Sequence, residues 1–417
     1  MLFSINQEKC VSCLACARVC PAEAVSVDGT SVKIVEESCI KCGICVPACP
    51  HDAIDAAGDF ERALALAYGG DAALILSVEA GVHFYPSLPD QVVNASYRAG
   101  FRTVHRGVMG DELVAAEYQR LLTDPDWGTM IRSTCPVVVE KVRAQYPELV
   151  PYLAPVTTPI AAEALYLKGM YGEDLPIVYA GVCLTEGGTQ VDAAITFDEL
   201  ARLFEARGVD ASAEESTFER IPEERRRHLS TAGGLPLKVL QEERQASRRF
   251  RKVRGLGALD AIANAVAVER MDLGFLDILP CEGCLDHPLM GPREELYKRR
   301  RILDGVEPPR SPLPVIDPDV PVDVQAAFEV RINGHHPPAR EIQAVLGRIG
   351  TTPSGKPWDC GACGFKTCWQ FAEALLKGRA TLRSCPPHQE KRARDVVDQA
   401  AFDELTGLAT FRVLKER

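Results

Sequence analysis

The stretch Cys10-Val-Ser-Cys13-Leu-Ala-Cys16-Ala-Arg-Val-Cys20-Pro21 decides how this chain begins to fold, because its pattern occurs twice. The second copy is Cys39-Ile-Lys-Cys42-Gly-Ile-Cys45-Val-Pro-Ala-Cys49-Pro50. Each copy reads Cys-x-x-Cys-x-x-Cys-x-x-x-Cys-Pro. Spacers this short force the backbone to wrap around whatever the thiolates bind and point amide N–H groups at it. The repeat therefore predicts two linked metal-binding loops.

This repeat resembles the bacterial two-cluster ferredoxins. In that family three closely spaced cysteines and one from the other half hold each [4Fe-4S] cluster. The resemblance implies one cluster on Cys10, Cys13, Cys16 and Cys49, and a second on Cys39, Cys42, Cys45 and Cys20. Zinc is the alternative, although structural zinc sites rarely use eight thiolates in this interlocked order. We expect the ferredoxin-type domain over residues 1–57, with a hairpin around Asp28-Gly29.

Composition narrows the classes of protein and partner. Acidic residues outnumber basic ones by 58 to 47 in a chain of 417 residues, and the net charge of −11 argues against a nucleic-acid partner. The sequence has neither a leader pattern nor an apolar run long enough for a membrane span, so we expect none and a cytoplasmic location. Sixteen cysteines in such a chain indicate metal ligation rather than disulfides.

Helix-like and strand-like segments alternate after residue 57. Helical spacing is visible at Phe60–Tyr68, Val92–Ala99 and Glu112–Leu122, and strand-like patterns at Ala72–Val78 and Arg102–His105. This order is typical of a layered domain with a parallel sheet. We predict an α/β domain over residues 58–306.

Three cysteine-containing segments follow: Ile131-Arg-Ser-Thr-Cys135-Pro136, Ile177-Val-Tyr-Ala-Gly-Val-Cys183 and Phe275-Leu-Asp-Ile-Leu-Pro-Cys281-Glu-Gly-Cys284. In order and flanking sequence, they resemble the catalytic domain of the [FeFe]-hydrogenase large subunit. The resemblance implies a two-lobed parallel α/β fold and a central [4Fe-4S] cluster on Cys135, Cys183, Cys281 and Cys284. The alternative is that isolated cysteines such as Cys135 and Cys183 are inert core residues.

This region departs from the hydrogenase pattern at three places. Thr134 stands where the family has a proton-relaying cysteine, and a hydroxyl is a poor proton carrier near neutral pH. The segment Leu184-Thr185-Glu186-Gly187-Gly188, directly after Cys183, has no lysine, although the family uses one there near the di-iron site. Cys281 and Cys284 are one residue closer than the family's bridging pair. We therefore assign no catalytic residue and expect no hydrogen turnover.

The C-terminal part contains a third cysteine motif. Prolines recur over residues 307–338, which predicts a linker, and Cys360, Cys363, Cys368 and Cys385 follow. This motif resembles the four-cysteine iron–sulfur domain of Rnf-type electron-transport subunits and of corrinoid iron–sulfur proteins. The resemblance implies a small, mostly helical domain over residues 339–387 with one more [4Fe-4S] cluster, zinc being the alternative. We expect a helix at Glu341–Ile349 and a C-terminal helix over residues 388–417.

Together these patterns predict a multi-domain α/β protein with four [4Fe-4S] clusters that acts in electron transfer or redox sensing. The expected partner is a redox protein, such as a ferredoxin or a dehydrogenase or reductase subunit, or a signalling output protein. A divergent [FeFe]-hydrogenase, or a reductase acting at the central cluster, is the alternative. The mixed charges of Glu214–Arg254 are typical of a solvated helix face, or else form a docking surface for an acidic electron carrier.

Overall fold

A computed structural model describes residues 2–28, 31–123, 128–216, 250–306, 320–331, 337–350, 352 and 354–401, the last four without side chains. The chain divides into two compact units. The first comprises Met1–Phe3, Ile40–Gly43 and Ala56–Ile332, and the second Ser4–Cys39, Ile44–Asp55 and Asn333–Arg417. No helix in the described ranges is long and apolar enough to cross a membrane.

The first unit contains a four-stranded parallel sheet with the strand order β6-β5-β8-β9. The strands are β5 (Ala73–Leu76), β6 (Thr103–His105), β8 (Ile177–Ala180) and β9 (Ala193–Ile195). Every residue of β5 and β8 is buried, as expected for strands covered on both faces. The predicted strands at Ala72–Val78 and Arg102–His105 are confirmed.

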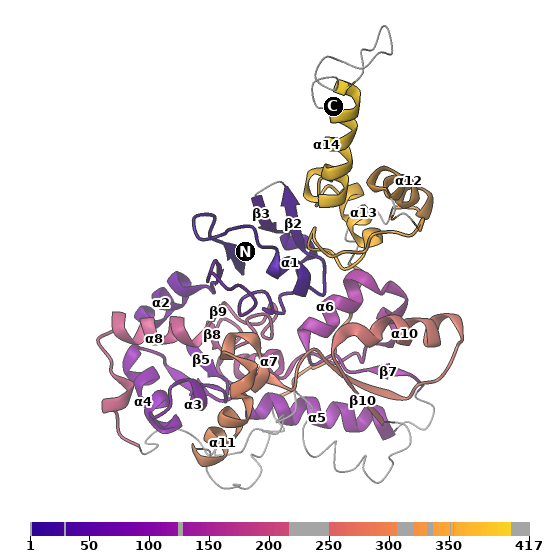
Figure 1. The fold of residues 1–417 in the computed structure, drawn as a ribbon. Coiled ribbons are helices and arrows are strands. Elements are labelled where there is room, and N and C mark those ends of the chain that lie inside the picture. The colour runs from indigo at the N-terminus through magenta and orange to yellow at the C-terminus, as the bar shows by residue number, and fades with distance from the viewer. Residues whose placement is uncertain are drawn as a thin grey trace. The chain divides into compact units, whose positions relative to one another are not determined.

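Helices cover both faces of this sheet (Figure 1). Leu74 and Leu76 pack with α2 (Phe60–Gly69), α4 (Pro89–Ala99) and α8 (Phe197–Ala206). Ala73 and Ile75 point to the other face, because side chains alternate along a strand, and they pack with α5 (Val108–Thr123) and α7 (Pro159–Tyr171). The three predicted helices coincide with α2, α4 and α5. This half is a three-layer α/β/α lobe.

A second parallel sheet has the strand order β10-β11-β7 and forms the other lobe. Its strands are β7 (Met130–Ile131), β10 (Phe250–Arg254) and β11 (Phe275–Leu279). Helices α5 and α7 also pack against this sheet. Tyr118 of α5 meets the Phe275 ring edge-on, with 5.8 Å between the ring centroids. The two parallel sheets confirm the predicted two-lobed α/β architecture.

One expectation is wrong in this lobe. Phe250–Arg254, which we interpreted as part of a charged helix face, is the strand β10. Pairing with β11 overrides the local charge pattern, because the neighbouring strand supplies backbone hydrogen bonds along all five residues. Residues 217–249 of the charged region lie outside the described residues.

The first unit contains further helices besides those described above. They are α3 (Ala80–His83), α6 (Pro136–Gln145), α10 (Leu259–Ala263) and α11 (Leu296–Val306), and the π-helical turn η5 (Asn264–Val268). Short 3-10 helices are η2 (Pro147–Tyr152), η3 (Ala211–Ala213), η4 (Leu256–Ala258), η6 (Cys284–Asp286), η7 (Pro288–Met290) and η8 (Arg293–Glu295).

The N-terminal cysteine repeat contains two small sheets. Strand β1 (Phe3–Ile5) pairs with β4 (Ile54–Ala56), and β2 (Val25–Asp28) pairs antiparallel with β3 (Ser31–Ile34). The short helices α1 (Ala15–Val19) and η1 (Glu36–Ser38) complete this part. The β2–β3 pair confirms the expected hairpin, whose turn residues lie outside the described ranges.

The second unit also holds the helices of the C-terminal part. They are α12 (Ala339–Ile349), α13 (Cys368–Leu376), η9 (Leu382–Ser384) and α14 (Pro386–Ala401). Helix α12 confirms the helix expected at Glu341–Ile349, and α14 confirms the C-terminal helix as far as Ala401. Residues 402–417 lie outside the described part, as does most of the proline-rich segment. The proposed domain boundaries stay predictions.

Backbone contacts join the hairpin β2–β3 to the C-terminal part inside the second unit. The Val27 amide donates to the Arg379 carbonyl at 2.8 Å, and Val27 forms a parallel bridge with Ala380. The Arg379 guanidinium in turn donates to the Glu23 carbonyl at 2.7 Å. Two cysteine-rich segments at opposite ends of the sequence therefore share one compact unit.

Glu199 of α8 tests how the α/β/α lobe binds the segment at Gly58, just before α2. Its carboxylate accepts hydrogen bonds from the amides of Gly58 and Thr196, at 2.9 and 2.8 Å, in a buried position. Glu199→Ala leaves both buried amide donors without an acceptor, so we expect the free energy of unfolding to fall by about 2 kcal/mol. Calorimetry of the anaerobic protein measures this loss. Glu205→Ala, on an exposed position of the same helix, is the control, and an equal loss there contradicts the assignment.

Candidate iron–sulfur cluster sites

The two N-terminal cysteine loops repeat the same unusual backbone conformation. Three pairs of residues, each pair 29 positions apart like Cys10 and Cys39, have positive φ angles: Ser12 and Lys41, Leu14 and Gly43, and Glu23 and Asp52. Five of these six are not glycine, so the conformation is strained and needs compensation from what surrounds it. Left-handed residues in such loops turn successive amide N–H groups inward, where they face an anionic centre.

The cysteines before each proline accept matching hydrogen bonds. Cys20 Sγ accepts from the Ala24 amide at 3.3 Å, and Cys49 Sγ accepts from the Ala53 amide at 3.4 Å. In the first loop, burial raises the pKa of Cys16 to about 11, and the nearby Cys10 and Cys13 thiolates raise it further. These three thiols are therefore neighbours. The exchange of the fourth ligand between the loops stays a prediction.

The central four cysteines all follow strands of the two parallel sheets. Cys135 follows β7 and precedes α6, Cys183 comes after β8, and Cys281 and Cys284 come after β11, with Cys284 opening the 3-10 helix η6. The carboxyl ends of parallel strands are where ligand-binding loops gather in open α/β sheets. The two lobes thus supply the four thiols to one place in the first unit.

Their electrostatic interactions show that the four thiols converge. Burial raises the pKa of all four, and that of Cys281 reaches about 12. After burial, Glu186 and then Cys135 raise the pKa of Cys183, and Cys135 raises that of Cys281. For Cys284, Glu79 and Glu186 act first, and Cys281 and Cys183 raise the pKa further. Thiols in such a place stay protonated unless a metal takes the proton's position. The donor set therefore fits a [4Fe-4S] cube, which would supply reversible one-electron chemistry.

A buried guanidinium adjoins these thiols. Arg132 is completely buried, and its Nε lies 3.1 Å from Asp277 Oδ1. Within the described chain, none of its three nitrogens has a hydrogen bond of good geometry. Its charge lowers the pKa of Cys135 and Cys281, opposing the effect of burial. A sulfur-rich anionic cluster beside the four thiols would accept hydrogen bonds from these unsatisfied guanidinium nitrogens. Sequence reasoning missed this pair, although Asp277 is the one charge in the apolar strand β11.

Acidic and phenolic groups also lie near the central thiols. The Tyr179 hydroxyl donates to Glu186 at 3.1 Å, and the Ser77 hydroxyl donates to Glu79 at 2.6 Å. Burial raises the pKa of Glu186 to about 8, and Glu79 raises it further. Thr134, expected at the relay position, is buried, and its hydroxyl has no partner among the described residues. Among the described residues, the main influences on the pKa of Glu186 and of Cys284 include no lysine.

The C-terminal cysteines also lie together. Burial raises the pKa of Cys363 to about 11, and Cys385 and Cys360 raise it further. Burial likewise raises the pKa of Cys385, followed by the effects of Cys368 and Cys360. Cys368 begins α13, and its Sγ accepts from the Asp359 amide at 3.3 Å. The four thiols of this set are within electrostatic reach of one another, as a four-thiolate cluster site requires.

Three family models match separate parts of this chain. A model of the C-terminal domain of the iron only hydrogenase large subunit matches residues 73–287, or 215 of 417 residues. The chain belongs to this family. The matched range includes the four central cysteines. A 4Fe-4S dicluster domain model matches residues 2–50 of this hydrogenase-family chain, and an Fe-S cluster domain model matches residues 358–387. The protein is therefore an iron–sulfur protein with a hydrogenase-like domain.

Two curated relatives are subunits B of ion-translocating oxidoreductase complexes. The one from Thiobacillus denitrificans is 32% identical over 73 residues, which are 18% of this chain and 34% of that protein. The one from Alkalilimnicola ehrlichii is 31% identical over 80 residues, 19% of this chain and 38% of that protein. The chain thus spans little more than a third of the relatives it matches.

Solved structures of [FeFe]-hydrogenases are also similar to this family member. A variant of HydA1 from Chlamydomonas reinhardtii is 16% identical, with 65% of this chain and 99% of that chain covered and a TM-score of 0.47. The structure of HydA(deltaEFG) is 16% identical with the same coverage and a TM-score of 0.46.

The central set makes a prediction about iron content. Cys284→Ser removes one of four thiolates, so we expect the purified protein to lose about four iron atoms per chain. Iron and sulfide analysis of anaerobic protein measures the loss. Thr134→Ala is the matched control, because it changes a buried residue beside Cys135 without removing a thiol. Full iron content in the Cys284 variant contradicts the assignment of this cysteine.

Arg132 and Asp277 predict opposite shifts of the central reduction potential. Arg132→Gln removes a buried positive charge beside the thiolates, so we expect the potential to fall by at least about 60 mV, a tenfold change for one electron. Asp277→Asn leaves that charge less neutralised, so the potential should rise. Redox titration followed by electron paramagnetic resonance separates the two results. Shifts of the same sign in both variants contradict the electrostatic explanation.

Proposed function

We propose that this hydrogenase-family protein transfers electrons through four [4Fe-4S] clusters and does not activate hydrogen. Its hydrogenase-family membership and the match to a 4Fe-4S dicluster domain support the electron-transfer part. Four thiol sets, which use all sixteen cysteines, support the number of clusters. The sixteen cysteines also suit a reducing compartment, for which we propose the cytoplasm.

The observation that carries the proposal is a contact between two cysteine loops of the second unit. Gly364 follows Cys363, and a Cβ built on it would lie 3.2 Å from the Cβ atoms of both Leu14 and Ala17. Leu14 and Ala17 flank Cys16 in the first ferredoxin-type loop. The C-terminal loop therefore packs directly on the loop of another cluster site. Because Gly364 has no side chain, only the Leu14 and Ala17 side chains lie at this contact, which keeps the two cysteine loops near each other.

A related contact lies within the first unit. Gly43, between Cys42 and Cys45, would place a Cβ 3.5 Å from His287 Cε1 and 3.7 Å from Pro288. The His287 amide donates to the carbonyl of Cys284 at 3.0 Å, so this histidine belongs to the central cysteine loop. Each of the two ferredoxin-type loops thus has a close glycine contact with one further cysteine site.

Three residue differences support the absence of hydrogen activation. The relay position holds Thr134, the bridging pair is shortened to Cys281 and Cys284, and Glu186 lies beside these thiols without a lysine in the segment. A di-iron unit needs a bridging thiolate and a cation for its anionic ligands. The alternative is a divergent hydrogenase or a reductase acting at the central site.

The expected partner is another redox protein. The relatives that match 18–19% of this chain are named as subunits of an oxidoreductase complex, which supports a role as one component of an electron-transfer assembly. Because the chain spans little more than a third of those relatives, their ion translocation is not carried over. A ferredoxin, or a dehydrogenase or reductase subunit, is the partner we propose.

Infrared spectroscopy tests whether hydrogen activation is absent. Protein purified without oxygen from its native host should lack the bands of iron-bound carbon monoxide and cyanide, while its iron content should approach sixteen per chain, about four for each cluster. Clear bands favour the hydrogenase alternative. Iron content near twelve, without bands, contradicts the number of clusters instead.

Gly364→Val tests the contact between the two loops. Its side chain must enter the space held by Leu14 and Ala17, so we expect the packing there to weaken by about 1–3 kcal/mol. We then expect faster hydrogen exchange at the Val27 amide. We also expect slower reduction of the C-terminal cluster, measured on samples frozen rapidly after the reductant is added. Gly355→Val is the control, because Gly355 also has positive φ but no atom within 4 Å of its added Cβ. Equal effects in both variants indicate backbone strain rather than a lost contact.

A further inference from the structure

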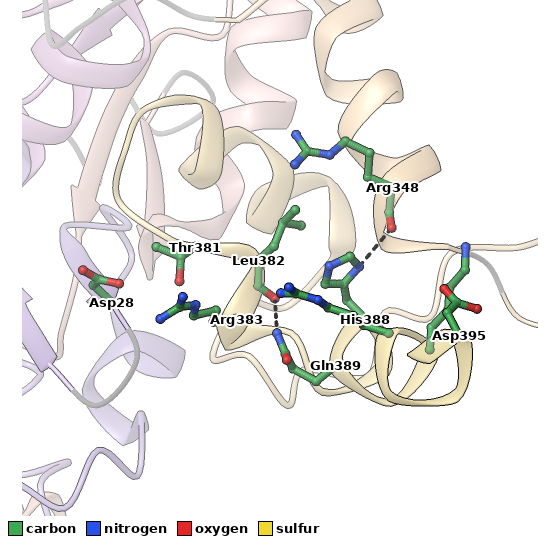
Figure 2. A pocket seen from close by; sticks show the side chains of 10 residues that line it. Asp28, Arg348, Thr381, Leu382, Arg383, His388, Gln389 and Asp395 are labelled. Carbon is green, nitrogen blue, oxygen red and sulfur yellow. Dashed lines mark hydrogen bonds between the residues drawn. The ribbon is translucent and has the colours of Figure 1, made fainter. Parts of the chain in front are cut away.

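An open cavity of about 690 Å³ lies at the surface of the second unit, between Asp28 of β2 and the C-terminal helices, and the charged side chains around it are exposed. Its lining comes from Asp28 of β2, Arg348 of α12, the residues Thr381–Arg383 around η9, and several residues of α14. Figure 2 shows Asp28, Thr381 and Arg383 at one side and Arg348 and Asp395 at the other. None of the predicted cluster ligands lines it.

The lining is rich in positive charge, in contrast to the acidic chain as a whole. Four cationic side chains, Arg348, Arg383, Lys391 and Arg392, face two acids, Asp28 and Asp395. Among the residues that the structure describes, none of the four forms an ion pair. Their neighbour Arg394, outside the lining, pairs with Glu390. Unpaired cations gathered around one cavity leave a positive potential that an anionic ligand would neutralise.

Hydrogen bonds hold the walls of this cavity. His388 Nδ1 lies 3.0 Å from the Arg348 carbonyl and joins α14 to α12, and the Gln389 amide group donates to the Leu382 carbonyl at 3.3 Å. Figure 2 draws both interactions. The cations therefore project from three elements, α12, η9 and α14, that are tied to one another. The N-terminal turn of α14 adds the positive end of a helix dipole.

The size and lining select a class of ligand. The volume lies within the usual range of small-molecule pockets, about 300–1,000 Å³. Guanidinium groups bind phosphate oxygens through paired hydrogen bonds. Cations on three different elements suit a ligand with several anionic groups better than one compact anion. The lining contains no phenylalanine, tyrosine or tryptophan, so charge rather than ring stacking carries recognition.

We propose that this cavity binds a small organic phosphate that carries two or more phosphate groups. Arg348, Arg383, Lys391 and Arg392 hold the phosphates. Asp28 and Asp395 limit the excess positive charge and favour a ligand that also has hydrogen-bond donors, such as sugar hydroxyls.

The cavity adjoins the C-terminal cysteine site. His388 lines the cavity, and its backbone N–H donates to Cys385, which belongs to that site. Reduction of a cluster there adds negative charge next to the bound phosphates and so weakens their binding, and by linkage the ligand lowers the potential of the cluster. This link rests on the proposed cluster, whereas binding in the oxidised protein does not.

Calorimetric titration of the full-length, oxidised protein with pyrophosphate tests the proposal at fixed ionic strength. We expect saturable one-to-one binding of pyrophosphate. Orthophosphate should bind at least about tenfold more weakly. The double variant Arg383→Gln/Arg392→Gln should bind pyrophosphate at least about tenfold more weakly. Arg394→Gln is the control on the same helix and should bind normally. Unchanged iron content and visible spectrum show that each variant is folded.

Four results overturn the proposal: no saturable binding, equal affinity for orthophosphate, equal weakening in the Arg394 variant, or binding of an acidic peptide without binding of pyrophosphate. The same titration on reduced protein tests the link to the cluster. We expect affinity to fall at least about fivefold on reduction. Equal affinity in both redox states overturns the link while leaving the pocket assignment intact.

Discussion

Burial of thiol groups is the constraint on which the rest of this structure depends. The central four cysteines lie where desolvation raises the pKa of each thiol. Neighbouring carboxylates and thiolates raise it further, whereas Arg132 lowers it for Cys135 and Cys281. Such a group of thiolates is stable only with compensating positive charge. Iron would supply most of it, and Arg132 supplies one charge from the protein. An anionic cluster at this place would explain both the unsatisfied nitrogens of Arg132 and the gathering of the cysteines.

The two lobes have their form because they must deliver these thiols from distant parts of the chain. Helices α5 and α7 pack against both sheets, so the strand ends of β7, β8 and β11 lie in one unit. Membership of the hydrogenase family describes this scaffold. The chemistry beside the thiols differs from the family pattern at Thr134 and at the shortened cysteine pair. A family fold can therefore persist while its reactive site changes.

The second unit joins cysteine sites that lie at opposite ends of the sequence. Its contacts are mostly between backbone groups or across glycine, as at Val27 with Arg379 and at Gly364 with Leu14. Glycine is favoured at position 364, because φ is positive there and an added Cβ would lie only 3.2 Å from the Cβ atoms of Leu14 and Ala17. The missing side chain of Gly364 lets its loop approach the Leu14 and Ala17 side chains closely, and a short distance between loops favours electron transfer.

The sequence alone determined the cysteine motifs, the alternation of helices and strands, and the departures from the hydrogenase pattern, and it predicted the cysteine sets. These features depend on local spacing, which is written directly into residue order. Only the tertiary structure revealed that Arg132 and Asp277 form a buried pair, that Phe250–Arg254 is a strand, and that four cations surround one cavity. Each of these depends on contacts between segments far apart in the chain. Local spacing carries no information about such contacts, because it does not specify which buried surfaces meet.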